Sequence, residues 1–599
     1  MMILLVGCGA AGSGMDAPAA PGRSAPAKRG SDVGFAVAAP DRGFLGNEEL
    51  TDLFRGFAAE HNAALVFVTD ERTGAELGGA VERLAARGAR RVVVLPMFLS
   101  AGATGFQTLE RVVKRGGYSL PVDMGERFGA SYLAVELLAD RLRALDGHKG
   151  RRLVVVGYGA AGADGRGAMN RDLEKVASAA ARGFGFESVR TVVWRHGFTT
   201  PQRRDEEAEA ALAAALAGAP RAQVVPFQLG PRLDSMMSFP SLVGRHVRAP
   251  AQLVDGELMP DPLVGLWMTR EAAAHLPLSP DDVGVVALAH GADHHWNQDM
   301  RKALAGPASR HRLEFAFSMA DPVVVERAVK RLEARGARAI VVVRVFAMAS
   351  SFRGSVERML GLDIEPGADA GHAGHGGHAG HGGHAAHGGH AAHGAGRAHR
   401  AAAADDHGHG HGHWAALPAP RIRSAARFVT VGGIEDSPEL AVALLERALA
   451  VSADPARETI ILTAHGDGND ATNQHWRDVL TSLASHMKRG RGAGFRAILH
   501  GTWREDWPDK RGREVAAIRK LVVDAAAGGG RAIVVPARTI GTGPERELLA
   551  GLEYTLGEGF APHRLFEKWF EAQVRAGVAE LAPAGTGDAS RARAAVTPR

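Results

Sequence analysis

The sequence predicts an α/β fold of four half-domains, each built on a parallel sheet and paired into two lobes. One observation is that short apolar runs, such as VVVLPMF from Val92 and IVVVRVF from Ile340, alternate with amphipathic stretches of ten or more residues. Continuous apolar strands separated by helices are typical of parallel sheets that are covered on both faces. The other observation is a long internal repeat, which makes the second half of the chain a copy of the first.

The repeat sets the expected domain boundaries. RLAARGARRVVVLPMF, ending at Phe98, resembles RLEARGARAIVVVRVF, ending at Phe346, at an offset of 248 residues. LAVELLADRL from Leu133 resembles LAVALLERAL from Leu440 at the larger offset of 307, so the second copy contains an insertion. We expect a first lobe at 32–275 and a second at 282–576, interrupted by an insertion at 366–420.

Composition excludes several classes of partner. A net charge of +5 on 599 residues, without a basic stripe interleaved with aromatic residues, argues against nucleic acid. No run approaches the roughly 18 uncharged apolar residues that a transmembrane span needs. The single cysteine, Cys8, excludes a disulfide framework and multi-thiolate metal sites. A bound metal would therefore be held by His or carboxylate groups.

The two ends of the chain are expected to be flexible. Cys8 follows Leu5-Val6-Gly7 in a pattern that resembles the lipobox of bacterial lipoproteins, and residues 9–31 are rich in Gly, Ala and Pro. This predicts a signal and tether at 1–31 and a membrane-anchored lipoprotein lipidated at Cys8. No Lys or Arg precedes the short apolar run, so an accidental Cys8 in a cytoplasmic protein is the alternative. Residues 577–599 are expected to form a flexible tail.

The insertion carries a histidine-rich tract. Histidine recurs every third residue and then alternates with Gly, in a segment whose Gly and Ala supply no core. We expect a disordered segment that binds divalent metals without selecting among Co2+, Ni2+, Zn2+ and Cu2+, the alternative being an inert linker. The predicted ligands are His372, His375, His378, His381, His384, His387, His390, His393, His407, His409, His411 and His413.

Three phrases carry a family resemblance: ALAHG at 287–291, FAFSMADPVVVERAVKRLEARGARAIVVV from Phe315, and VLPMFLSAG from Val94. They resemble the CbiX type of sirohydrochlorin cobaltochelatase, within the class II chelatases. The resemblance covers most of 32–576 in two copies. It implies a lyase that inserts Co2+, or else Ni2+ or Fe2+, into a tetrapyrrole held between two half-domains, in cobalamin or sirohaem biosynthesis.

The resemblance also implies two histidines in a half-domain. One follows the first strand, at His290 and His465 in the second lobe, but Pro40 and Tyr158 stand there in the first lobe. The other lies two residues after the Gly of the FLSAG-like phrase, where this chain has Thr104 and Phe352. We therefore expect a degenerate first lobe.

The chemistry of the second lobe follows from its residue types. Imidazole suits Co2+, Ni2+ or Fe2+ and accepts protons near neutrality, so His290 and His465 are the predicted metal ligands and catalytic groups. His500, aligned with His196 at a strand end, is a third candidate ligand. Three residues are predicted to bind substrate, namely Trp296, Trp476 and Arg504. Helix capping by such loop residues, and a non-catalytic metal-binding or tetrapyrrole-binding lipoprotein, are the alternatives.

Overall fold

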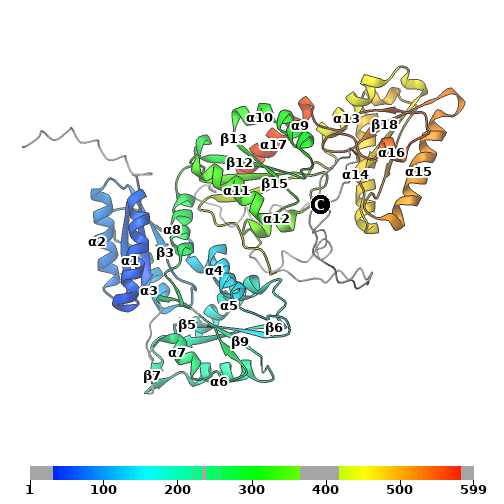
Figure 1. The fold of residues 1–599 in the computed structure, drawn as a ribbon. Helices are drawn as coiled ribbons and strands as arrows, with labels where there is room; N and C mark the ends of the chain where they lie inside the picture. The colour runs from blue at the N-terminus through cyan, green and yellow to red at the C-terminus, as the bar shows by residue number, and fades with distance from the viewer. Residues whose placement is uncertain are drawn as a thin grey trace, which may run out of the picture.

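The computed structural model describes residues 32–363 and 417–581, apart from 201, 220, 232–237 and 255–256 (Figure 1). Cys8, the predicted tether at 1–31 and the predicted histidine ligands from His372 to His413 lie outside the described residues. None of the described helices combines the length and the apolar character needed to cross a bilayer.

The first half-domain is a parallel sheet of order β2-β1-β3-β4 with helices on both faces. Strand β1 is buried along almost its whole length because VGFAVAAP has no charged residue. Helix α2 buries Leu77, Ala80, Val81 and Leu84, which share one helical face. The elements are β1 (Val33–Pro40), α1 (Gly43–Glu60), β2 (Ala63–Val68), α2 (Thr73–Ala86), β3 (Arg91–Pro96), α3 (Thr104–Arg115) and β4 (Val122–Met124).

The second half-domain repeats this strand order around β5. Its sheet runs β10-β9-β5-β6, and β11 also pairs with β9. The elements are α4 (Tyr132–Arg143), β5 (Arg152–Ala160), α5 (Gly162–Ala181), β6 (Ser188–Arg195), β7 (Thr199–Thr200), β8 (Arg203–Arg204), α6 (Glu206–Leu216), β9 (Gln223–Pro231), α7 (Phe239–Gly244), β10 (Gln252–Leu253), β11 (Glu257–Met259) and α8 (Pro262–His275).

The third half-domain has the order β13-β12-β14-β15, again entirely parallel. Its strand β14 reads AIVVVRV and is buried throughout. The elements are β12 (Val283–Ala289), α9 (His294–Ala303), α10 (Ala305–Arg310), β13 (Arg312–Phe317), α11 (Pro322–Ala334), β14 (Ala339–Val345), α12 (Arg353–Met359) and β15 (Arg427–Gly432).

The fourth half-domain has the order β17-β16-β18-β19. The predicted four parallel sheets are thus confirmed, and all four place the first strand of the unit between its second and third. The elements are α13 (Pro438–Val451), β16 (Glu458–Ala464), α14 (Asp470–Lys488), β17 (Ala497–Thr502), α15 (Pro508–Ala526), β18 (Arg531–Pro536), α16 (Glu545–Leu548), β19 (Thr555–Leu556) and α17 (Arg564–Leu581).

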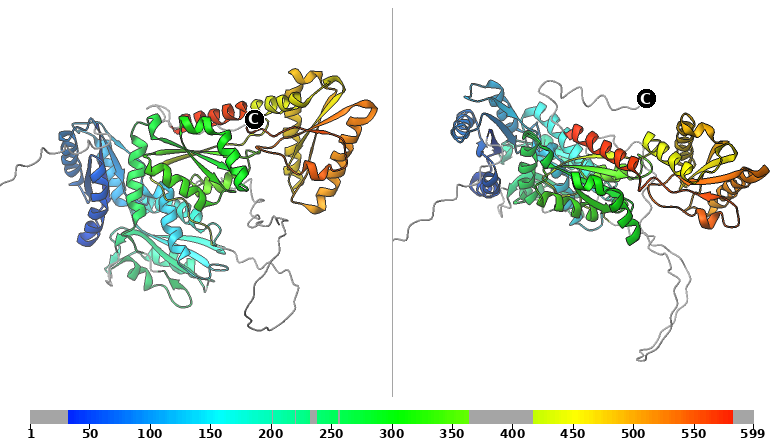
Figure 2. Two further views of the ribbon diagram at one scale, coloured as in Figure 1. Left: turned by 45° about the horizontal axis from the view of Figure 1, so that its top comes forward. Right: turned by 90° about the horizontal axis from the view of Figure 1, so that it is seen from above.

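Each lobe is fastened by a helix that returns to the preceding sheet. Helix α8 ends the second half-domain but packs on α1 and β3 of the first. Helix α17 ends the fourth but packs on β14 and β15 of the third, alongside α13 (Figures 1 and 2). Phe566, Phe570 and Val574 of α17 are buried there. The helix continues to Leu581, so residues 577–581, where the flexible tail was expected to begin, are helical.

The two lobes meet through a buried network of charges. The Arg421 side chain is 4% exposed and reaches Glu136 of α4, which is fully buried, at 3.4 Å. Arg182 pairs with Asp363 at 2.8 Å, and the hydroxyl of Tyr132 donates to the carbonyl of Ile422 at 2.7 Å. Asp363 and Arg421 flank the undescribed segment, so both ends of the insertion are held against the first lobe.

Candidate functional site

His465 begins a loop at the carboxyl end of β16, the edge at which parallel α/β sheets bind ligands. Its Nε2 lies 3.1 Å from Oδ2 of Asp506, and its Nδ1 lies 2.9 Å from the carbonyl oxygen of Gly466. Both ring nitrogens therefore face acceptors. A neutral imidazole can donate to one of them, whereas an imidazolium donates to both.

Two tryptophans stand beside His465. The ring of Trp476, on α14, lies 6.5 Å from the imidazole, and that of Trp507 lies edge-on at 5.8 Å. The corresponding residue of the third half-domain, Trp296, lies edge-on to Phe317 at 6.3 Å. The two tryptophan rings beside His465 offer aromatic surface on which a flat ligand can stack.

Arg504, predicted to bind substrate, is buried among loop contacts, and its predicted role stays a prediction. Its side chain is 3% exposed, and it donates to the carbonyls of Asp467 and Gly468 and to the carboxylate of Asp470. Arg504 and Lys510 hold the pKa of Asp470 below its usual value. Through Nε and Nη2, the guanidinium thus holds the loop that carries His465.

His500 does not end its strand. It lies inside β17, pairs with Leu462 of β16, and is followed by two more strand residues. At about 3.3 Å per residue, His465 begins about 10 Å further along the sheet. The Nε2 of His500 lies 3.0 Å from the hydroxyl of Thr481, and burial, with Arg477 nearby, lowers the pKa of His500. It is a helix-facing residue of the edge strand rather than a member of the His465 cluster.

The sheet register explains the error. Tyr158 pairs with Trp194 in the second half-domain, and the equivalent of Tyr158 is His465, which follows the Ala464–Thr502 pair. Trp194 therefore corresponds to Trp503, and both are fully buried. The true counterpart of Trp194-Arg195-His196 is Trp503-Arg504-Glu505. The shared His-Gly dipeptide had suggested an alignment shifted by five residues.

His290 is exposed at the end of β12, where its Nδ1 lies 2.6 Å from the carbonyl oxygen of Gly291. The following Asp293 caps α9 by accepting from the backbone N–H of Trp296 at 2.8 Å. Helix capping, the alternative interpretation of these loop residues, is therefore what Asp293 does. His290 itself stays a candidate ligand with an open environment.

His290 and His465 belong to different sheets. Figures 1 and 2 show the fourth half-domain standing apart from the third, with α13 and α17 between them. Direct links include His475 to Glu435 at 3.6 Å and the Ser482 hydroxyl to Asp436 at 2.6 Å. In the described part of the chain, no three His, Cys, Asp or Glu side chains converge as a metal-binding group.

The first lobe is closed where the second is open. Thr104, at one of the expected histidine positions, donates to the carbonyl of Gly159 at 3.2 Å, and Ala161 donates its N–H to Gly102 at 3.0 Å. The carboxyl edges of its two sheets are thus in backbone contact. Phe352, the counterpart of Thr104, instead packs on Phe346 at 5.1 Å within its own half-domain.

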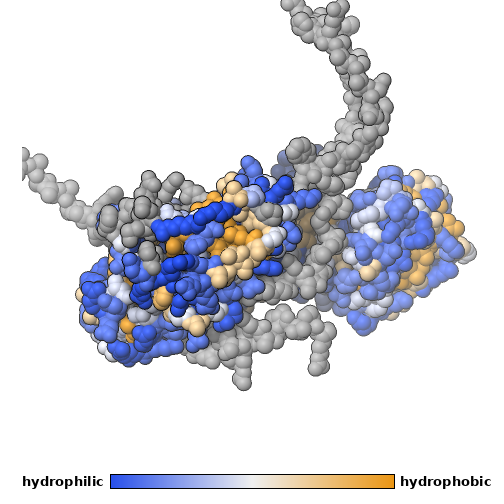
Figure 3. All heavy atoms as spheres, turned by 90° about the horizontal axis from the view of Figure 1, so that it is seen from below, coloured by the Kyte–Doolittle hydropathy of each residue, from blue (hydrophilic) through white to orange (hydrophobic). Residues whose placement is uncertain are grey.

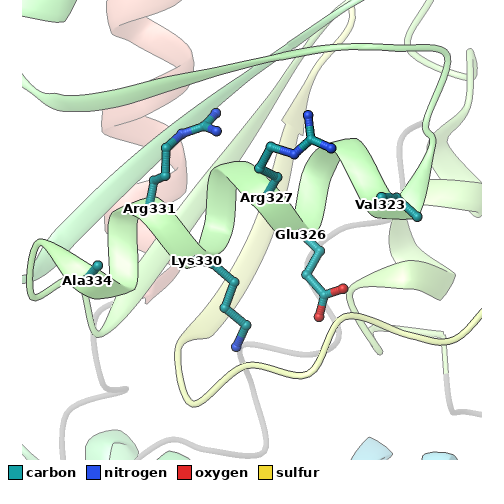
Figure 4. A pocket seen from close by; sticks show the side chains of 6 residues that line it. All are labelled: Val323, Glu326, Arg327, Lys330, Arg331 and Ala334. Carbon is teal, nitrogen blue, oxygen red and sulfur yellow. The ribbon is translucent and has the colours of Figure 1, made fainter.

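Two other surfaces offer no enclosed site. Figure 4 shows a shallow hollow on α11, lined by Val323, Glu326, Arg327, Lys330, Arg331 and Ala334. These side chains lie along one exposed helix face and several are paired, as Arg331 is with Glu314. Figure 3 shows a mostly hydrophilic underside with apolar areas on both bodies of the molecule.

Asp506 and Trp507 were not assigned a role beside His465 from the sequence. Both lie in the segment after β17, about forty residues from His465, as the 41-residue separation of the His465–Asp506 contact shows. Their position after a strand could have indicated this role. Strands β16 and β17 are adjacent and parallel, so the residues that follow the two strands lie at the same edge of the sheet.

The CbiX family model matches residues 45–145, within the first lobe. A search of curated proteins finds no match. Among solved structures, the chain is similar to the sirohydrochlorin chelatase SirB from Bacillus subtilis subspecies spizizenii in complex with cobalt, at 15% identity and a TM-score of 0.29. SirB from Bacillus subtilis with Fe3+ gives 17% identity and the same TM-score. Each match covers 39% of this chain and 91% of the other.

A periplasmic solute-binding protein from Actinobacillus succinogenes with bound D-allose gives 12% identity and a TM-score of 0.20, over 40% of this chain and 82% of that one. TM-scores this low establish no common architecture over the whole chain. The CbiX match is confined to residues 45–145 and describes that part of the chain.

Proposed function

We propose that this CbiX-type chelatase uses its second lobe to insert a divalent metal ion into a sirohydrochlorin-type tetrapyrrole, with Co2+ preferred over Ni2+ and Fe2+. The observation that carries the proposal is the His465–Asp506 pair, set beside Trp476 and Trp507 at the carboxyl edge of β16. The family match supports metal chelation of this substrate class. The choice of cobalt, and of the cobalamin or sirohaem pathway, is part of the proposal.

The reaction exchanges two pyrrole protons of the macrocycle for one divalent ion, which becomes bound to the pyrrole nitrogens. The His465–Asp506 pair accepts the two pyrrole protons one after the other, and the carboxylate of Asp506 stabilises the imidazolium that forms each time. The proton then passes to solvent, because Asp506 is largely exposed. Trp476 and Trp507 supply apolar surface for the flat macrocycle.

His290 is the second imidazole of the proposal. It would hold the incoming metal ion, since neutral imidazole binds Co2+, Ni2+ and Fe2+ and no hydrogen-bond partner of its Nε2 is found in the described residues. His290 and His465 lie on different half-domains, so joint action requires the third and fourth to approach about α13 and α17. The histidine tract would supply metal ions to this lobe, while lipidation at Cys8 stays a prediction.

The test is the change in tetrapyrrole absorbance on metallation by the full chain, with the spontaneous rate subtracted. We expect His465→Ala and His290→Ala each to lower the rate on the order of 100-fold. Asp506→Asn should lower it less and shift the pH profile, because the imidazolium loses its counter-charge. His486→Ala, on the surface of α14, is the matched control. An intact chain with no excess over the spontaneous rate would contradict the proposal.

Binding without turnover is the second candidate function. The described residues contain no three-ligand metal group, and the two half-domains of the second lobe stand apart, which favours this alternative. It predicts saturable binding of metal-free tetrapyrrole or of Co2+ that His465→Ala weakens, with no catalysed insertion of any of the three metals. Absorbance titration and the rate assay together separate the two functions.

A further inference from the structure

The first lobe has a group of polar residues at the edge where its two sheets meet. Arg42 follows β1, Tyr158 lies near the end of β5, and His196 follows β6. The rings of Tyr158 and His196 lie 6.0 Å apart, and the N–H of Gly197 donates to the Tyr158 hydroxyl at 3.3 Å. Residues from both half-domains therefore contribute to one group.

This group is cationic. Burial lowers the pKa of Arg42, and its buried Nε has no hydrogen-bond partner in the described part of the chain. Burial also lowers the pKa of His196, and the charged groups that act on it are Arg42 and Arg203, both cations. A buried guanidinium N–H without an acceptor costs free energy, and an anion beside it would supply the acceptor.

The nearby carboxylates are already paired. Asp41 accepts from the amide of Asn47 at 2.8 Å and from the N–H of Gly43 at 2.9 Å. Asp205 is fully buried and accepts from Arg166 at 2.8 Å and from the backbone N–H of Arg195 at 2.8 Å. Neither carboxylate makes a described ion pair with Arg42 or Arg203.

Aromatic surface adjoins these cations. The guanidinium of Arg203 lies over the ring of Phe198 at 4.7 Å, and Tyr158 packs against Phe239 at 5.1 Å. Stacking holds Arg203 beside the His196 loop while leaving it exposed to solvent. The group thus has a half-buried cation, Arg42, and an exposed one, Arg203.

We propose that the first lobe binds a small oxyanion, a carboxylate or a phosphate, between Arg42, His196 and Arg203. The contact of Thr104 with Gly159 leaves no space for a macrocycle between those two rims, so the ligand is smaller than a tetrapyrrole. At the positions equivalent to Arg42, Tyr158 and His196 the second lobe has Ala292, His465 and Glu505, so neither cationic position carries an Arg or a His there. The first lobe would then have exchanged metal chemistry for anion binding.

The experiment is calorimetric titration of the full chain with succinate and, separately, with inorganic phosphate. Because one charge-assisted contact is lost in each variant, we expect Arg42→Ala and Arg203→Ala to weaken binding about tenfold or more. Arg111→Ala, an exposed residue of α3, is the matched control. Arg203 lies in an exposed hairpin, so its variant tests the site even where Arg42→Ala impairs folding.

Stronger binding of succinate identifies a carboxylate ligand, and stronger binding of phosphate identifies a phosphate ligand; either result supports the site. The absence of saturable binding of both anions up to millimolar concentration would overturn it, as would equal losses in all three variants. The readout is independent of metal insertion, so the proposed function can fail while this site stands, and the reverse.

Discussion

The two lobes have the same sheet topology, but the polar residues at their sheet edges differ. In the first lobe, Thr104 and Gly102 close the edge against the second half-domain, and cations gather around His196. In the second lobe, Phe352 stays within its own half-domain, and His465 faces the carboxylate of Asp506. Four parallel sheets of one topology thus support two different chemistries, because ligand chemistry depends on the loops that follow the strands.

The lobes also differ in how they are held. The halves of the first lobe touch through backbone at their edges, whereas those of the second are joined mainly through α13 and α17. The third half-domain in turn packs on α4 and α5 of the first lobe through Arg421 and Asp363. The first lobe therefore packs against the third half-domain through these buried ion pairs. Truncation to the second lobe would expose them to solvent.

The largest expected effect comes from breaking that support. Glu136→Ala removes a fully buried partner of Arg421 and Arg143, which keep Asp363 at 3.9 Å and Asp140 at 2.7 Å. Removing one partner from a buried ion pair costs about 3–5 kcal/mol. We expect a loss of that size in the free energy of unfolding, measured by denaturant titration. Lys520→Ala, from an exposed pair with Asp524, should change it by less than about 1 kcal/mol. Equal effects of the two variants would show that the network does not hold the lobes together.

A smaller loss is expected from forcing the first lobe open. A Cβ at Gly102 would lie 2.0 Å from the carbonyl oxygen of Gly165, so Gly102→Ala must separate the two half-domains. Overpacking of this kind costs roughly 1–3 kcal/mol. Gly354→Ala, after the equivalent strand of the open lobe, meets nothing within 4 Å and is the control. Thermal unfolding measures both, and a neutral Gly102→Ala would show that the closure is loose.

A weaker effect concerns pH and His500. Because burial lowers its pKa in the folded state, the unfolded chain binds the proton more readily, and stability falls as the pH drops below about 6.5. The counterpart in the first lobe is Thr191, which donates to Asn170 at 2.7 Å and has no such titration. We expect His500→Gln to reduce the slope of stability against pH between the lowered pKa and 6.5. An unchanged slope would contradict the burial of His500.

The smallest change in stability is expected from removing the tract. Deletion of residues 371–413 should leave the thermal midpoint nearly unchanged, since a Gly, Ala and His segment supplies no core. The bound metal per chain, measured by equilibrium dialysis with Co2+, should fall by most of its value. A large drop in the midpoint would show that the segment packs against one of the lobes.

The internal repeat and the continuous apolar runs were enough to predict the four sheets from the sequence alone. Strands such as AIVVVRV have no polar face, and only a sheet covered on both sides accommodates them. The same reasoning located His465 at a strand end. It placed His500 at the end of a strand, whereas His500 lies inside β17. The alignment was based on the His-Gly pair at His196 and His500 and not on the Trp-Arg pair at Trp194 and Trp503.

Only the tertiary structure decided which polar side chains make hydrogen bonds and ion pairs within the protein. The sequence determined that Arg504 follows a strand, but its burial and its three acceptors on the loop at 467–470 depend on how two distant loops pack. The sequence likewise shows Asp506 two residues after Arg504. The contact of Asp506 with His465, however, depends on the parallel pairing of β16 and β17. Periodicity encodes local structure, because it reflects which face of each element is buried. The contacts of polar loop residues depend on several elements at once, and no pattern within one of them records those contacts.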